Sequence, residues 1–312
     1  MAMISRRAFV TATAASVATP NVARGKECPP VGMDWMTMSL EARNLAYNNG
    51  EHVGLDYART KTESWIVASK ALREQRSKHL DLPYAPGERT KWDLYPANDA
   101  KAPCFVHIHG GYWQRNSKEV FAFLAEGPLA RGWSAALPGY TLAPQASLTQ
   151  ITNEVRTAFD WLNANSAEHG ITGPIIVTGW SAGGHLTAFI LDHPKVAAGL
   201  SISGVFDLAA LRDSPHVNDK VKLTEKEIET LSPMRQPSAN KPLAIAYGTG
   251  ELPAMIASSR DYHGYRSQAH LPGDLVPISN TNHYTILDQL RVPDSVLTRG
   301  PSDGRIQNRI TD

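Results

Sequence analysis

The hexapeptide Gly179-Trp180-Ser181-Ala182-Gly183-Gly184 could supply a nucleophile. It follows an apolar run, residues 175–178, and opens a helical run that begins at Ala182. The pattern G-x-S-x-G therefore stands between a strand and a helix, where a sharp turn exposes the serine. Side chains at the flanking glycines would collide with backbone in such a turn. The free N–H groups of the helix start favour negative charge beside the serine. We expect Ser181 to attack an acyl carbon rather than simply to cap the helix.

A second motif, His109-Gly110-Gly111-Tyr112-Trp113, directly follows the apolar residues 104–108. Acyl transfer places negative charge on a carbonyl oxygen, and backbone N–H groups aimed at that oxygen stabilise it. Adjacent glycines let the backbone approach a ligand closely. We expect His109 to order this loop by hydrogen bonding. A metal site at His107 and His109 is disfavoured because no further ligands gather nearby, so neither metal nor cofactor is expected. The residues expected around the oxyanion are Gly110, Gly111, Tyr112 and Ala182.

The candidate base is one of 11 histidines. His283 follows the last apolar β-type run, residues 275–278, through the turn-prone residues 280–282. His263 and His270 lie within or at the end of the preceding helical run and are expected at the surface. Chains with this type of serine turn carry nucleophile, acid and base in that order. We therefore expect His283 to take the proton from Ser181.

Two residues remain as alternatives for the acid, which orients the imidazole and stabilises the cation formed on proton transfer. Glu251 follows the apolar residues 243–247 by way of Gly248-Thr249-Gly250, the usual place for this residue. Asp207 follows the preceding strand-like run. We favour Glu251 and keep Asp207 as the alternative.

The elements that must position these residues alternate between short apolar runs and longer amphipathic runs. Strands are predicted at residues 91–95, 104–108, 133–137, 175–178, 199–202, 243–247 and 275–278. Helices are predicted at residues 117–131, 148–167, 182–192, 254–269 and 284–290, with a largely helical stretch at 40–80. Such alternation predicts an α/β fold with a mainly parallel sheet covered by helices on both faces. Residues 208–234 form an insertion that is either a lid over the ligand crevice or a surface excursion without a role.

Composition favours one globular domain over residues 26–300. Of the 312 residues, 42% are hydrophobic and 20% are charged, and the formal net charge is +1. Neither a nucleic-acid partner nor a membrane is therefore expected. Two cysteines make no disulfide framework: Cys104 is expected to be a buried thiol, and Cys28 could pair only in an oxidising compartment.

The two ends of the chain differ from the rest. Residues 1–25 contain Arg6-Arg7 before a weakly apolar run, which is typical of a twin-arginine export signal and predicts a periplasmic protein. An uncleaved cytoplasmic tail is the alternative. The polar residues after Arg291 are expected to fray, with a disordered tail at 301–312.

The chain resembles the arylformamidase (kynurenine formamidase)-like branch of the α/β-hydrolases. The resemblance extends over about residues 43–290 and includes a segment near the N-terminus, Ala46-Tyr47-Asn48-Asn49. It implies Ser181 as nucleophile, Glu251 as acid and His283 as base, although the best-known members carry aspartate at the acid's position. The other matching segments are His109–Trp113, Pro138–Pro144, Gly179–Leu186, Ser203–Leu208, Gly250–Pro253 and Asn282–Tyr284.

The favoured hypothesis is hydrolysis of a small aryl or acyl amide, such as an N-formyl anilide, through an acyl-enzyme. Tyr112, Trp113 and Trp180 could form aromatic walls for a flat substrate, and core packing is an equal alternative for Trp180. A carboxylesterase acting on short-chain or aryl esters would use the same residues. A ligand-binding protein on an inactive hydrolase scaffold is the remote third hypothesis.

Overall fold

The computed structural model describes residues 38–300, which form a three-layer α/β structure. Its eight-stranded sheet has the order β1-β2-β4-β3-β5-β6-β7-β8. Strand β2 runs antiparallel to both of its neighbours, and β4, β3, β5, β6, β7 and β8 are parallel. The strands are β1 (Leu82–Pro83), β2 (Lys91–Tyr95), β3 (Cys104–Ile108), β4 (Ser134–Pro138), β5 (Ile175–Trp180), β6 (Val196–Ile202), β7 (Leu243–Gly248) and β8 (Leu275–Ile278). The fold is that of an α/β-hydrolase, as predicted.

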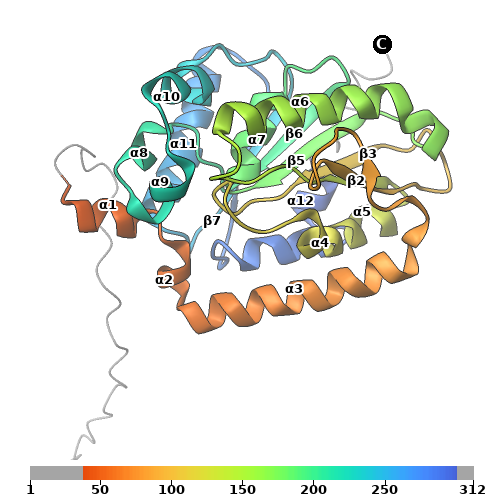
Figure 1. The fold of residues 1–312 in the computed structure, drawn as a ribbon, viewed down its shortest axis with the longest axis horizontal. Helices are drawn as coiled ribbons and strands as arrows, with labels where there is room; N and C mark the ends of the chain where they lie inside the picture. Colours follow the sequence, from red (N-terminus) through yellow and green to blue (C-terminus); the bar gives the residue numbers. More distant parts are fainter. Residues whose placement is uncertain (1–37, 301–312) are drawn as a thin grey trace, which may run out of the picture.

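Helices cover both faces of this sheet (Figure 1). The α-helices are α1 (Leu40–Ala46), α2 (Asn49–Val53), α3 (Leu55–Gln75), α4 (Lys118–Phe121), α5 (Glu126–Ala130), α6 (Leu148–Asn165), α7 (Ala182–Ile190), α8 (Ala209–Arg212), α9 (Pro215–Val221), α10 (Glu225–Leu231), α11 (Pro253–Gln268) and α12 (Val296–Arg299). Short 3₁₀ helices are η2 (Ser77–His79), η3 (Ala122–Ala125), η4 (Ser166–His169), η5 (Pro233–Arg235) and η6 (Thr285–Arg291).

Two hydrophobic clusters follow from the alternation of side chains along the strands. In β3, Cys104 and Val106 belong to the cluster under α6, α7 and α11, whereas Phe105 belongs to the cluster under α3, η3 and η6. Successive strand residues point to opposite faces, so a parallel strand between two helical layers must be apolar on both sides. This is why the parallel strands read in the sequence as mainly apolar runs without a clean alternation of polar and apolar residues.

Helix α6 shows how local sequence sets an element. Ser147 caps its start by accepting a hydrogen bond from the N–H of Gln150 at 3.2 Å. Apolar residues then recur at helical spacing and are buried against the sheet. They are Leu148, Ile151, Val155, Ala158, Phe159 and Leu162.

Two predictions about elements were wrong. Residues 117–131 do not form one helix but three short elements in a row, α4, η3 and α5. Gly127 of α5 packs closely against η6, because a Cβ at this position would lie 2.1 Å from the carbonyl oxygen of Leu290. Residues 292–300 do not fray: Leu297 of α12 is 1% exposed, and the Arg131 guanidinium donates to the carbonyl of Pro293 at 3.0 Å. The expected export signal (1–25), Cys28 and the tail (301–312) lie outside the described residues.

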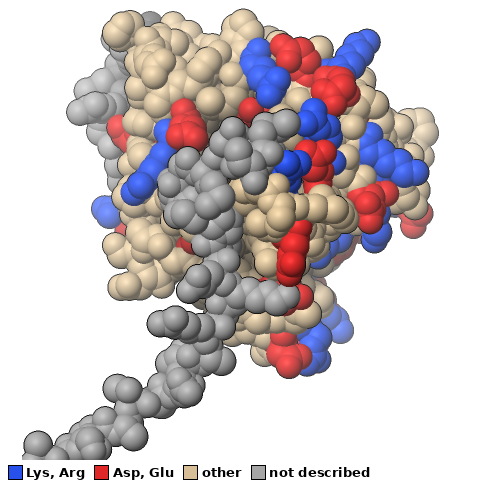
Figure 2. Space-filling view, turned by 90° about the vertical axis from the view of Figure 1, so that its left-hand side faces the viewer, with Lys and Arg blue, Asp and Glu red and all other residues tan. Residues whose placement is uncertain are grey.

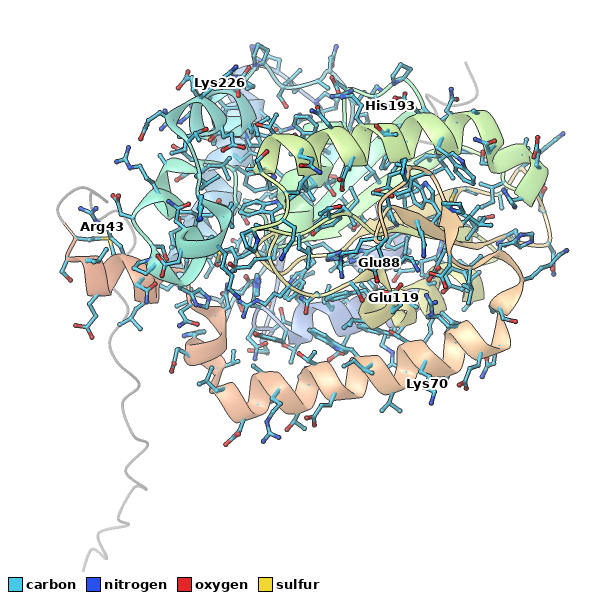
Figure 3. All side chains as sticks on the ribbon, viewed as in Figure 1. Arg43, Lys70, Glu88, Glu119, His193 and Lys226 are labelled. Carbon is cyan, nitrogen blue, oxygen red and sulfur yellow. The ribbon has the colours of Figure 1, made fainter. Side chains whose placement is uncertain are left out.

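The surface carries charges of both signs. Lys and Arg side chains alternate with Asp and Glu on the face shown in Figure 2, in keeping with a net charge of +1. Lys70 on α3 and Lys226 on α10 extend from opposite helical layers (Figure 3). Within residues 38–300, no helix is both long and apolar enough to span a bilayer.

Candidate active site

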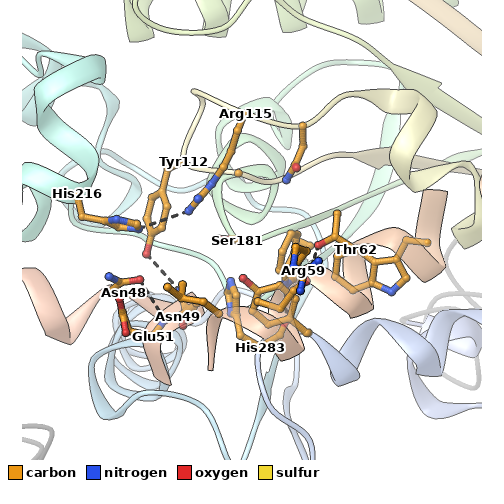
Figure 4. Close-up of a pocket in the computed structure, with 18 of the residues that line it drawn as sticks. Asn48, Asn49, Glu51, Arg59, Thr62, Tyr112, Arg115, Ser181, His216 and His283 are labelled. Carbon is orange, nitrogen blue, oxygen red and sulfur yellow. Dashed lines mark hydrogen bonds between the residues drawn. The ribbon is translucent and has the colours of Figure 1, made fainter. Parts of the chain in front are cut away.

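The turn between β5 and α7 places Ser181 in a strained conformation. Its φ and ψ are 58° and −119°, in a region that residues other than glycine rarely occupy. Gly183 makes the turn possible, because a Cβ there would lie 2.0 Å from the carbonyl oxygen of Ile108. Ser181 lines a cavity of about 480 Å³, which also includes His283 and Tyr112 (Figure 4).

His283 and Glu251 form a buried ion-pair-type contact. The imidazole Nδ1 lies 2.8 Å from Oε2 of Glu251, and both side chains are almost wholly buried. The other carboxylate oxygen, Oε1, accepts hydrogen bonds from the Ser203 hydroxyl and the Gly248 N–H, each at 2.6 Å. These two donors hold the carboxylate in place, and its Oε2 occupies Nδ1 of His283. Nε2 is therefore the ring nitrogen left to act as a base.

Of the two candidate acids, only Glu251 contacts His283. Asp207 instead pairs with Arg235 at 3.0 Å and accepts from the N–H of Ala209, with 43% of its side chain exposed. It belongs to the base of the insertion rather than to the cavity.

The indole of Trp180 connects the serine turn to the histidine loop. Its N–H donates to the carbonyl of His283 at 2.8 Å, and the two rings lie 4.7 Å apart. Trp180 precedes Ser181 directly in the chain, so this bond holds the two loops in register. Trp180 also lines the cavity, and it therefore has both of the roles that the sequence left open.

The loop after β3 approaches the serine turn closely. A Cβ at Gly110 would lie 2.4 Å from the carbonyl oxygen of Trp180 and 3.1 Å from the Ser181 Cβ, so only glycine fits there. Gly111 and Tyr112 have φ of 117° and 50° and line the cavity. The N–H of Ala182 is the first of α7 and has no acceptor within the helix. The backbone N–H groups of Gly111, Tyr112 and Ala182 can serve as oxyanion donors.

Buried neighbours brace this loop. His109 Nδ1 lies 3.0 Å from the Gly110 carbonyl oxygen, and the Tyr140 hydroxyl donates to the His109 carbonyl at 2.8 Å. Asn116 also donates to the Gly110 carbonyl, at 3.2 Å. Burial lowers the pKa of His109 to about 4, so its ring is neutral at physiological pH. His109 therefore orders the loop, as expected from its position.

Other expected site residues lie elsewhere. Trp113 is 0% exposed and packs edge-on against His185, at 5.1 Å between ring centroids. The expectation that Trp113 forms a cavity wall is therefore wrong, because its positive φ of 56° belongs to a turn that carries the ring into the core. His107 is fully buried, and burial lowers its pKa to about 3. Among residues 38–300, no group of three or more His, Cys, Asp or Glu is placed to hold a metal ion.

Much of the cavity wall comes from residues to which the sequence assigned no role in the site. Asn49 and Thr62, from α2 and α3, line it together with Arg115 and with His216 of α9. Arg115 contacts His216 between Nη2 and Nε2 at 3.4 Å. The insertion thus contributes at least one wall residue. Arg43 of α1 forms an ion pair with Asp213 of the insertion at 2.6 Å, which ties the insertion to the N-terminal helices.

Comparison with known proteins agrees with this architecture. The BD-FAE family model matches residues 92–225. A kynurenine formamidase of Salmo salar is 30% identical over 237 residues, which cover 70% of this chain and 79% of the relative. That of Danio rerio is 26% identical over 85% of this chain and 96% of the relative. The chain belongs to the kynurenine formamidase (arylformamidase)-like family of α/β-hydrolases.

A solved structure shares the fold of this chain. A “putative thioesterase” from Silicibacter sp. TM1040 superposes with a TM-score of 0.72 and 29% identity, covering 82% of this chain and 97% of that one. The member of the arylformamidase-like family described here is thus a hydrolase of the esterase or amidase type.

Proposed function

We propose that the protein is a serine hydrolase that cleaves small aryl or acyl amides through an acyl-enzyme at Ser181. The observation that carries the proposal is the shared cavity: Ser181 lines it beside His283, whose Nδ1 is held by Glu251 at 2.8 Å. A volume of about 480 Å³ lies in the range of small-molecule sites. The curated relatives named kynurenine formamidase favour an amide substrate.

In this mechanism the Ser181 hydroxyl oxygen attacks the substrate carbonyl carbon while Nε2 of His283 takes the hydroxyl proton. Glu251 accepts the Nδ1–H bond and stabilises the imidazolium cation. N–H groups of Gly111, Tyr112 and Ala182 stabilise the oxyanion. Nε2 then gives its proton to the leaving nitrogen as the carbon–nitrogen bond breaks. Water repeats the cycle on the acyl-enzyme and releases the acid.

Hydrolysis of short-chain or aryl esters is the second candidate. The Silicibacter structure, described as a putative thioesterase, is the observation that favours an acyl substrate whose leaving atom is not nitrogen. The machinery needs no change, because an ester oxygen leaves more readily than an amine and makes less demand on proton transfer.

A hydrolysis panel tests the proposal. Formyl, acetyl and longer acyl anilides should be compared with matched phenyl esters, for the wild-type protein and for Ser181→Ala. We expect turnover of the short anilides, and loss of roughly six orders of magnitude in kcat for Ser181→Ala. Retained activity in Ser181→Ala would contradict the serine mechanism. Turnover of esters alone would favour the second candidate.

A further inference from the structure

The peptide unit between Gly110 and Gly111 carries the N–H group of Gly111, one of the three candidate oxyanion donors. This peptide bond is trans, so its carbonyl and its N–H point in opposite directions within one plane. The Gly110 carbonyl oxygen accepts hydrogen bonds from Nδ1 of His109 at 3.0 Å and from Nδ2 of Asn116 at 3.2 Å. The N–H of Gly111 donates to no backbone carbonyl within residues 38–300. The groups that hold the carbonyl therefore set the direction of the N–H.

This peptide unit turns more easily than an ordinary one. No Cβ restricts the rotation on either side of it, because both residues are glycine. Bulkier residues that would stiffen it do not fit. A Cβ at Gly110 would lie 2.4 Å from the carbonyl oxygen of Trp180, and a Cβ at Gly111 would lie 2.5 Å from a backbone oxygen, that of residue 115. Hydrogen bonds to the carbonyl must therefore supply the restraint that the side chains cannot.

Of the two donors, Asn116 is the one that ties the peptide to a separate anchor. His109 directly precedes Gly110 in the chain, whereas Asn116 lies six residues beyond it and closes the loop. The backbone of Asn116 has a φ of 73°, a left-handed conformation that asparagine tolerates, and its carbonyl accepts from Nη2 of Arg89 at 2.5 Å. Its NH₂ group must face Gly110, because turning the amide over would place two acceptors together.

Resting on the proposed acyl transfer at Ser181, we propose that Asn116 is a positioning residue of the oxyanion hole: it holds the Gly110 carbonyl and so keeps the N–H of Gly111 turned toward the carbonyl oxygen of the substrate. That oxygen gains negative charge when Ser181 attacks, and the N–H stabilises it. A peptide unit that turned over would present the Gly110 carbonyl oxygen to this charge and repel it. Amides and esters are affected alike, because both form the same oxyanion.

The test exchanges the atom that the N–H stabilises. 4-Nitrophenyl acetate is compared with its thiono analogue, in which sulfur replaces the carbonyl oxygen. Sulfur is a weak hydrogen-bond acceptor, so well-aimed donors favour the oxygen substrate. The ratio of the two kcat/KM values within one preparation cancels the amount of active protein, and a purely structural loss would lower both values equally.

Two variants remove the donor and keep a residue that suits the left-handed backbone. Asn116→Gly deletes the side chain, and Asn116→Asp keeps its shape but presents only acceptors to the Gly110 carbonyl. The matched control is Asn280→Gly. Asn280 is exposed, has a φ of 58° and lies in the loop before His283, so this variant loosens another loop of the site by the same exchange.

We expect both Asn116 variants to lower the oxygen-to-sulfur ratio roughly 10- to 100-fold, somewhat less than the loss of a whole oxyanion donor. The fall should lie in kcat rather than KM, because the oxyanion exists only beyond the ground state. Asn280→Gly should keep the wild-type ratio. An unchanged ratio in both Asn116 variants, or an equal fall in Asn280→Gly, would overturn the inference and leave the proposed hydrolase function intact. Activity that survives Ser181→Ala would overturn the inference together with that function.

Discussion

Replacing Glu251 by glutamine should inactivate the protein although it hardly changes the shape of the side chain. The site of Oε1 receives two hydrogen bonds, from the Ser203 hydroxyl and from the Gly248 N–H. The backbone N–H cannot reverse its role, so the amide oxygen of glutamine takes this site. The amide NH₂ group then faces Nδ1 of His283 at the position where Oε2 now lies at 2.8 Å.

This arrangement forces the wrong tautomer. Nδ1 has to accept from the NH₂ group, so the ring proton moves to Nε2, which can no longer take the proton of Ser181. The charge that stabilises the imidazolium is lost as well. A wrong tautomer in a serine triad costs ~10⁴ in kcat, which corresponds to ~5.5 kcal/mol of transition-state free energy.

The assay is kcat and KM on 4-nitrophenyl acetate, with the melting temperature as the check on folding. Glu251→Asp serves as the matched control, because it keeps the charge and shortens the side chain by one methylene. Its loss should be near 10², the cost of a displacement of about 1 Å. If Glu251→Gln kept more than a tenth of the wild-type kcat, or exceeded Glu251→Asp, the tautomer argument would be refuted.

Three further predictions concern other parts of the molecule. Ser203→Ala removes one of the two donors to Glu251 and should lower kcat/KM roughly 10- to 100-fold. The control Ser201→Ala lies two residues earlier, in β6, where the hydroxyl donates to the Gly184 carbonyl, and it should leave kcat/KM within a few-fold. Burial lowers the pKa of three imidazoles, so between about pH 6.5 and about 4 they bind protons only when the protein unfolds. The free energy of unfolding, measured by denaturant titration, should therefore fall as the pH drops through this range, by up to ~1.4 kcal/mol per pH unit for each histidine. A free energy of unfolding that does not change over this range would contradict the prediction. These imidazoles are His107, His109 and His185, with pKa values of about 3, 4 and 4. We also propose twin-arginine export: a double Arg6→Lys, Arg7→Lys variant should stay in the cytoplasm of a bacterial host with that pathway, and equal periplasmic yields of variant and wild type in cell fractions would argue against it.

The sequence predicted those features that depend on local pattern. Strands β3 and β8 begin and end where the sequence predicted. For β3 the bounds were readable because a strand buried on both faces stays mostly apolar until it leaves the sheet. The turn at Ser181 was readable since its glycines serve a close backbone approach. The buried, free thiol of Cys104 was also expected, and burial raises its pKa to about 12.

Features set by long-range packing could not be read in this way. Asn49 and His216 reach the cavity from segments that are distant in sequence, and a helical pattern does not tell which residue faces a particular wall. Trp113 follows Gly111 and Tyr112, which both line the cavity, yet the turn carries the Trp113 ring into the core against His185. The only trace of Asn49 in the sequence was the Ala46–Asn49 segment of the family resemblance.

The central claim, attack by Ser181 with His283 as base, is tested most directly by trapping the covalent intermediate. The protein should be treated with a fluorophosphonate, digested, and mapped by mass spectrometry, with His283→Ala alongside. We predict one adduct on the peptide that carries Ser181, formed at least ~10³ times more slowly in His283→Ala. An adduct on another residue, or equal labelling rates in the two proteins, would contradict the mechanism.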